Sequence, residues 1–136
     1  MITSRLKIIF AFSIPLFILH GIEEFVTHFY DIDIHDQAIF GVLSGLSNHG
    51  ATFVTFQIML WLLLIISLLL LLGPKWQFNV LALVGLIYLY ETHHIYKAIM
   101  VGGYYPGLYT ALLFLPIAFF FWREWLSNFN RAPFKK

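Results

Sequence analysis

Long apolar stretches separated by short polar segments dominate the sequence, and each stretch is long enough for a helix that crosses a membrane. The hydrocarbon core of a bilayer requires about 20 mostly apolar residues in helical form. Four stretches meet this requirement, at residues 6–28, 51–72, 76–100 and 106–125. The pattern therefore predicts an all-α protein, a bundle of four transmembrane helices that forms a single membrane domain over residues 1–136.

Turn-forming residues mark the ends of these stretches. Gly73 and Pro74 end the second stretch, because glycine tolerates the cap conformation and proline cannot continue a helix. Gly102 and Gly103 close the third, and Pro106 suits the first turn of the fourth. Short turns are therefore expected after the second and third stretches, and a longer connection after the first.

Composition excludes several classes of protein. Apolar residues make up 60% of the chain and charged residues only 11%, whereas a soluble domain has about 25% charged residues. The net charge of +1, without a basic stripe, gives no reason to expect nucleic acid as a partner. Because there is no cysteine, disulfides, thiolate metal ligands and cysteine nucleophiles are excluded.

The basic residues predict the orientation in the membrane. Of the eight, only Lys97 falls on one side of a four-helix arrangement. The other side holds Arg5, Lys7, Lys75, Arg123, Arg131, Lys135 and Lys136. Since flanks rich in Lys and Arg stay in the cytoplasm, we expect an integral membrane protein with both termini cytoplasmic. The first apolar stretch is expected to be a retained helix, because no small-residue cleavage site of a signal peptide follows it.

The first apolar stretch carries four ionisable side chains near its end, His20, Glu23, Glu24 and His28. At 100° per residue, His20, Glu24 and His28 fall at about 0°, 40° and 80° around a helix, with Glu23 at about −60°. They therefore share one face. Ionisable groups within a membrane helix are costly unless they pair, so this face is expected to point into the bundle and to be functional.

The third stretch repeats this feature with Glu91 and His94, which lie about 60° apart on one helical face. His93 points about 160° away from Glu91, and we expect it near Lys97 instead. His20 and Glu91 each lie about 20 Å along their helices from the inner interface. Because the first and third helices run in the same direction, the two groups should meet at one level, in the outer half of the bilayer.

Histidine and carboxylate ligands together suit Zn, Fe or Mn better than Mg or Ca, and a Glu-x-x-His pair on a helix is the unit of carboxylate-bridged metal bundles. We therefore expect His20, Glu24, Glu91 and His94 to bind a divalent metal, most simply Zn or Fe. Glu23 is expected to act as a general base or as a bridging ligand. Glu24 is a candidate for either the metal-binding or the catalytic role.

Other polar residues near the outer interface have two interpretations each. Tyr104 either belongs to the aromatic belt of the interface or reaches over the site as an acid or hydrogen-bond donor. Pro106 and Gly107 are interpreted as a structural turn that places Tyr104 there. His28 and His49 are either interfacial or additional ligands.

The connection after the first stretch is rich in acidic residues. Asp31, Asp33, His35 and Asp36 are expected to form a solvated outer loop, with a surface metal site as the less favoured alternative.

Three ordered motifs connect these residues with a known family. They are His20-Gly21-Ile22-Glu23-Glu24, Glu91-Thr92-His93-His94 and Tyr104-Tyr105-Pro106-Gly107. The chain resembles the HXXEE family of small membrane proteins, which carry HxxEE, ExxH and YxPG motifs in this order. The resemblance implies an integral membrane enzyme. It also implies functional positions, which are His20, Glu23, Glu24, Glu91, His94, Tyr104, Pro106 and Gly107. Tyr90 departs from the family pattern, which often has asparagine before the glutamate.

These observations predict a membrane-embedded, metal-dependent enzyme that acts on a lipid or another apolar small molecule reaching it from the bilayer. Hydrolysis is the simplest reaction with a metal-bound water, while iron would suit oxygen-dependent hydroxylation or desaturation. The alternatives are a metal-free acid–base cyclase or isomerase of isoprenoid lipids, and a proton or metal-ion transporter. A transporter with four helices would be a homodimer. The sequence leaves the substrate and the metal open.

Overall fold

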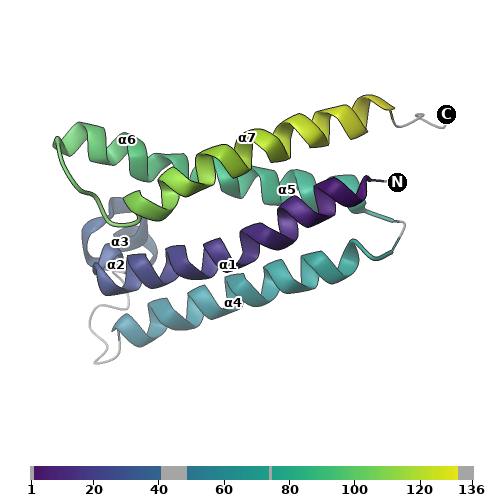
Figure 1. Ribbon diagram of the computed structural model, residues 1–136. Coiled ribbons are helices and arrows are strands. Elements are labelled where there is room, and N and C mark those ends of the chain that lie inside the picture. Colours follow the sequence, from purple (N-terminus) through teal and green to yellow (C-terminus); the bar gives the residue numbers. More distant parts are fainter. Residues whose placement is uncertain (1, 41–48, 74, 132–136) are drawn as a thin grey trace.

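The computed structural model describes residues 2–40, 49–73 and 75–131, and within these ranges the chain forms helices and no strand. The helices are α1 (Ser4–Val26), α2 (Phe29–Ile32), α3 (Ile34–Phe40), α4 (His49–Leu70), α5 (Gln77–Tyr90), α6 (Thr92–Val101) and α7 (Leu108–Arg131) (Figure 1). The predicted all-α class is confirmed.

Three of the helices, α1, α4 and α7, are each long and apolar enough to cross a membrane. The predicted third transmembrane stretch is instead divided into α5 and α6, which meet at Glu91. The backbone of Glu91 keeps right-handed helical angles, with φ −60° and ψ −18°. α6 therefore continues along the bundle in the same direction as α5 (Figure 1). Length and composition alone thus support three membrane-crossing helices.

The long helices lie side by side, with α1 packed between α4 and α7 and with α5 against α7 (Figure 1). The start of α1, the end of α7 and the start of α5 lie at one end of the bundle. The short helices α2 and α3 lie at the opposite end, beside the start of α4 and near α6. This arrangement gives the bundle two chemically distinct ends.

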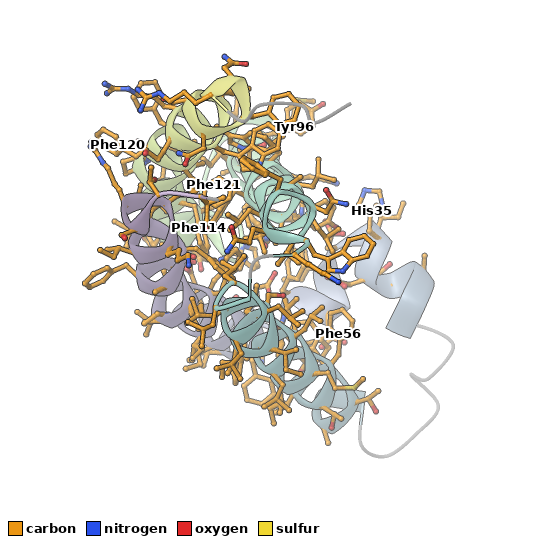
Figure 2. All side chains as sticks on the ribbon, turned by 90° about the vertical axis from the view of Figure 1, so that its right-hand side faces the viewer. His35, Phe56, Tyr96, Phe114, Phe120 and Phe121 are labelled. Atoms are coloured by element: carbon orange, nitrogen blue, oxygen red, sulfur yellow. The ribbon has the colours of Figure 1, made fainter. Side chains whose placement is uncertain are left out.

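Aromatic packing fills the space between the helices. The ring centroids of Phe17 and Phe114 lie 4.5 Å apart, and the Tyr88 hydroxyl donates to Ser13 Oγ at 2.5 Å. In the view along the bundle, Phe114 lies between the helices while Phe120 points outward (Figure 2). These contacts fix α1, α5 and α7 relative to one another immediately beneath the polar residues of α1.

The segment of α2 and α3 is more buried than the sequence suggests. Asp33 is 0% exposed, and its Oδ2 accepts a hydrogen bond of 2.7 Å from the Tyr105 hydroxyl. Phe29 is buried as well, whereas Asp31 and His35 are exposed. The expectation of a solvated loop is therefore wrong for Asp33, because the connection between α6 and α7 packs over this segment and supplies a partner for the carboxylate.

Candidate metal centre

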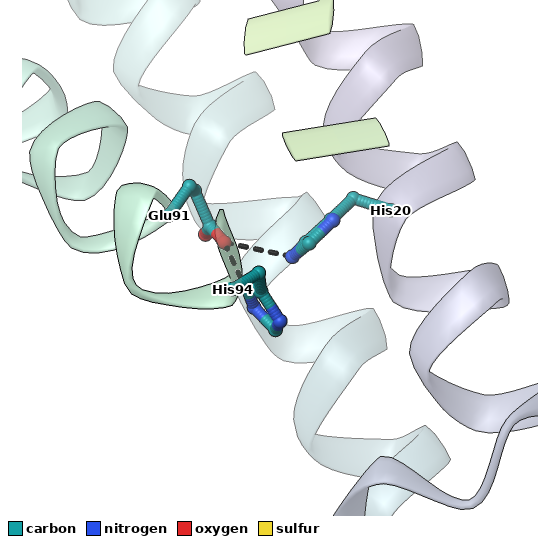
Figure 3. A group of neighbouring side chains, drawn as sticks. All are labelled: His20, Glu91 and His94. Carbon is teal, nitrogen blue, oxygen red and sulfur yellow. Dashed lines mark ion pairs between the residues drawn. The ribbon is translucent and has the colours of Figure 1, made fainter. Parts of the chain in front are cut away.

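Three helices contribute side chains to one buried cluster. α1 supplies His20 and Glu24, Glu91 stands at the junction of α5 and α6, and His94 lies in the first turn of α6. All four residues are between 1% and 6% exposed. His20, Glu91 and His94 each offer one ligand atom within 4.8 Å of the others (Figure 3). The structure thus brings together the four residues that the sequence pattern selected as ligands.

Each imidazole presents its Nε2 atom to both carboxylates. His20 Nε2 lies 2.7 Å from Glu91 Oε2 and 3.5 Å from Glu24 Oε1. His94 Nε2 lies 3.3 Å from Glu24 Oε1 and 3.5 Å from Glu91 Oε2. Two nitrogens and two carboxylate oxygens therefore face one small volume.

The hydrogen bonds on the far side of the two rings determine where their protons are. His94 Nδ1 lies 2.6 Å from the Pro106 carbonyl, which can only accept, so this nitrogen carries a proton. His20 Nδ1 lies 2.6 Å from Thr110 Oγ1, whose own proton goes to Glu23 Oε2 at 2.5 Å. Thr110 must therefore accept from His20. A neutral ring with its proton on Nδ1 presents an Nε2 lone pair to the centre of the cluster, whereas a doubly protonated ring donates from Nε2 to the carboxylates.

With both rings neutral, the carboxylates of Glu24 and Glu91 have no positively charged partner within the cluster. The Nε2 atoms of His20 and His94 are buried and have no hydrogen-bond partner among the described residues. Lone pairs that face carboxylate oxygens repel them, and burying such groups without a partner is costly. In a tetrahedral site with metal–ligand bonds of about 2.0–2.1 Å, neighbouring ligands lie about 3.3 Å apart. The ligand atoms of His20, Glu91 and His94 lie within 4.8 Å of one another, and the separation of 3.5 Å between His94 Nε2 and Glu91 Oε2 is close to this edge, so these residues fit a divalent metal ion.

Glu23 points away from this cluster. Its carboxylate accepts hydrogen bonds from the Tyr109 and Thr110 backbone N–H groups at 3.2 and 3.0 Å and from the Tyr104 hydroxyl at 2.9 Å. The N-terminus of a helix favours such an anion. Glu23 therefore lies at the start of α7, where it cannot bridge the cluster, and Tyr104 contacts Glu23 rather than the cluster.

The turn before α7 packs directly on the two imidazoles. Gly107 has a φ of +82°, and a Cβ atom there would lie 2.6 Å from His94 Nδ1 and 2.8 Å from His20 Cε1. Only glycine fits this position without displacing the rings. Pro106 and Gly107 therefore form the turn before α7 and pack against the His20 and His94 rings.

The three motifs are thus parts of one site, and residues 11–121 match the family described as "Protein of unknown function with HXXEE motif". The chain belongs to the HXXEE family. No curated protein and no solved structure matches the chain.

Gln57 and Thr110 belong to the same site but lie outside the HXXEE motifs. Gln57 Nε2 on α4 donates to Glu24 Oε2 at 2.7 Å. The glycine of the HxxEE motif makes room for it, because a Cβ atom on Gly21 would lie 2.6 Å from Gln57 Oε1. An amide within an otherwise apolar transmembrane stretch was the available signal for Gln57. Thr110, at the start of an apolar helix, gave no comparable signal.

Two further histidines with described side chains, His93 and His28, lie outside the cluster. The His93 ring contacts the His94 ring at a tilt of 47°, with ring centroids 4.0 Å apart, but its Nε2 faces Asp33 Oδ2 at 3.7 Å. His93 therefore points to a different side of the helix from Glu91, in agreement with the helical spacing of the two residues. The His28 side chain is 68% exposed, and the side chain of His49 lies outside the described residues.

A cavity of about 290 Å³ adjoins the cluster. Glu24, Glu91 and His20 line it together with Asp36 of α3. Burial, followed by the negative charges of Glu24 and Asp33, raises the pKa of Asp36 to about 7. The apolar walls include Phe17, Phe29, Phe53, Phe56, Leu60 and Ile87. The HXXEE cluster therefore has both a polar centre and an adjacent space for an apolar ligand.

Proposed function

We propose that this HXXEE protein is a membrane-embedded, metal-dependent enzyme. The observation that carries the proposal is the buried convergence of His20 Nε2 and His94 Nε2 on the carboxylate oxygens of Glu24 and Glu91. His20, His94 and Glu91 are the metal ligands, since two histidines and one glutamate form the donor set of many catalytic zinc sites. A bound divalent ion would supply an activated water and polarise a substrate oxygen.

Glu24 is the residue that we assign to proton transfer. Its Oε1 faces both imidazoles, while its Oε2 is held by the Gln57 amide. A carboxylate oriented in this way beside a ligand set suits a general base. Hydrolysis is the simplest reaction for zinc, and oxidation of a hydrocarbon is the corresponding reaction for iron. Glu23 and Tyr104 act in this proposal as positioning residues at the start of α7.

The proposal includes a bundle of four transmembrane segments, in which α5 and α6 together form the third. Both termini are cytoplasmic, and a lipid or another apolar molecule is the substrate. Support comes from the burial of the cluster within apolar helices. The continuous course of α5 and α6 along the bundle gives further support (Figure 1).

Metal analysis of the purified protein tests this function. We expect about one Zn or Fe ion per chain by mass spectrometry, with its loss in His20→Ala, Glu91→Gln and His94→Ala. His93→Ala is the matched control, because this neighbouring ring faces Asp33, and it should retain the metal. Folded wild-type protein that takes up no metal when supplied with Zn and Fe(II) would overturn the proposal.

One distance favours a second candidate, a metal-free acid–base catalyst. The contact of 2.7 Å between His20 Nε2 and Glu91 Oε2 is shorter than the edge of about 3.3 Å expected between ligands of a tetrahedral metal. A proton between these atoms would satisfy both. Protonation of an isoprenoid alkene or epoxide is then the fitting reaction, and the metal analysis separates the two candidates.

A further inference from the structure

We infer that the cavity beside the cluster binds one hydrocarbon chain of an uncharged lipid that carries an oxygen function, such as a fatty alcohol, aldehyde or ester. The chain enters from the bilayer between α4 and α5. This inference rests on the proposed function, because it places the oxygen function of the lipid at the His20, Glu24 and Glu91 side chains.

The cavity has a polar end and an apolar end. His20, Glu24 and Glu91 form the polar end, and Phe53 and Ile87 belong to the apolar walls. This distribution matches a ligand with one polar group and a hydrocarbon remainder.

The exposed lining residues identify the mouth of the cavity. Phe56 on α4 is 47% exposed and Tyr90 on α5 is 55% exposed, while Phe53 and Phe17 are buried. The two exposed residues lie on different helices, so the opening lies between α4 and α5. In the view along the bundle, Phe56 projects from α4 (Figure 2). A ligand in the surrounding hydrocarbon can therefore reach the cluster without crossing the aqueous phase.

The size of the cavity limits the ligand to one chain. Its volume of about 290 Å³ lies at the lower end of the range of about 300–1,000 Å³ for ligand pockets. Phe56 and Leu60 also line a shallow apolar groove of about 580 Å³ on α4, together with Met59, Leu62, Leu63 and Ile66. Because the two spaces share these residues, the remainder of the chain can continue along the outer surface of α4.

The charges around the cavity select against an anionic head group. Glu24, Glu91 and Asp36 bring three carboxyl groups to it, and none of the described residues that line it is Lys or Arg. A divalent ion balances two of these charges and leaves no excess positive charge for a fatty carboxylate or a phosphate. An uncharged oxygen function meets no such repulsion.

Photolabelling of the full chain in detergent, loaded with metal, tests the inference. The probe is hexadecanol with a diazirine in the middle of its chain, and the comparison is hexadecanoic acid with the same diazirine. We expect the alcohol to label peptides around Phe56 and Ile87, and excess hexadecanol to compete. The acid should label about tenfold less. Leu60→Trp, which places a larger side chain in the cavity wall, should lower labelling by about tenfold. Leu69→Trp, on the exposed face of the same helix, should leave it unchanged.

Two results would overturn the inference. Labelling that persists in Leu60→Trp would come from the outer surface alone, and equal labelling by the acid would contradict the charge argument. Ile87→Trp, from the opposite wall, gives an independent result if Leu60→Trp does not fold. Metal content is measured on the same samples. Absence of metal removes the proposed function, whereas metal-containing protein with labelling insensitive to both variants removes only the cavity as the binding site.

Discussion

At the scale of single residues, the adjacent glutamates of the HxxEE motif have different partners because successive helical side chains point about 100° apart. Glu24 faces the imidazoles, whereas Glu23 faces the start of α7 and holds the Thr110 hydroxyl. Through Thr110, Glu23 fixes the proton of His20 on Nδ1. One glutamate therefore belongs to the centre of the cluster, and the other orients the His20 ring through Thr110.

Replacing Thr110 tests this orientation. Thr110→Val removes the acceptor of the His20 Nδ1 proton, and we expect metal affinity to fall by about 10–100-fold, as is typical for such outer hydrogen bonds. Competition with a chelating dye measures the change. Thr55→Val is the control, since the Thr55 hydroxyl is exposed and donates to the backbone carbonyl of Ala51. Equal affinity of the wild type and Thr110→Val would show that His20 needs no such support.

Two glycines with positive φ angles, Gly102 and Gly107, allow the effect of backbone strain to be measured separately from the effect of steric contact. Gly107→Ala places a Cβ atom against both imidazoles, whereas Gly102, with φ +66°, has open space around it. Each substitution should destabilise the protein by about 1–2 kcal/mol through the left-handed backbone. Only Gly107→Ala should also abolish metal binding. Thermal unfolding and metal content, measured on both variants, check this, and equal metal loss in both would contradict it.

Periodicity within one helix was sufficient to predict the inward positions of His20, Glu24, Glu91 and His94, because spacing alone defines a helical face. It could not predict the partner of Glu23, which lies 86 and 87 residues away in the chain. Hydrogen bonds between such distant residues depend on how the helices pack.

At the scale of elements, α2 and α3 form a cap at one end of the bundle. Tyr105, in the connection between α6 and α7, attaches this cap to the bundle through its hydrogen bond to Asp33. Although burial acts to raise it, the pKa of Asp33 is lowered by hydrogen bonds from Tyr105 and the His35 N–H, and by the positive charge of Lys97. The lowered pKa means that the ionised Asp33 stabilises the folded state. This burial could not be predicted from the chain pattern, because Tyr105 is 72 residues away.

Tyr105→Phe tests the attachment of the cap. The variant should be less stable by about 1.5–3 kcal/mol at neutral pH, as expected for a buried hydrogen bond to a charged group. Because the folded-state pKa of Asp33 lies below its ordinary value of 3.8, this difference is present above pH 3.8. It should disappear as the pH falls through the folded-state pKa. Unfolding in detergent over this pH range measures it, with the exposed Tyr96→Phe as control. A difference independent of pH would contradict the role of Asp33.

At the scale of the whole molecule, α5 and α6 decide how many times the chain crosses the membrane. Neither is long enough alone, because the break at Glu91 divides the 25 residues 77–101 into two helices. Together they carry the chain from the end of the bundle where α5 starts to the opposite end, where α6 ends (Figure 1). If α1, α4 and α7 cross the bilayer, this geometry requires a fourth crossing.

Single cysteines test this topology without background, because the chain has none of its own. We choose Lys75→Cys, Gly103→Cys and Arg131→Cys, since all three positions are exposed. With four crossings and cytoplasmic termini, a membrane-impermeant maleimide should label only the cysteine at position 103 on intact cells. All three should react after permeabilisation. With three crossings, and α5 and α6 on the membrane surface, positions 75 and 103 would lie on the same side and position 131 on the other. The labelling pattern of intact cells therefore distinguishes the two topologies. Only the four-crossing pattern leaves the His20 and Glu91 side chains at one depth within the bilayer, as the proposed reaction on a lipid requires.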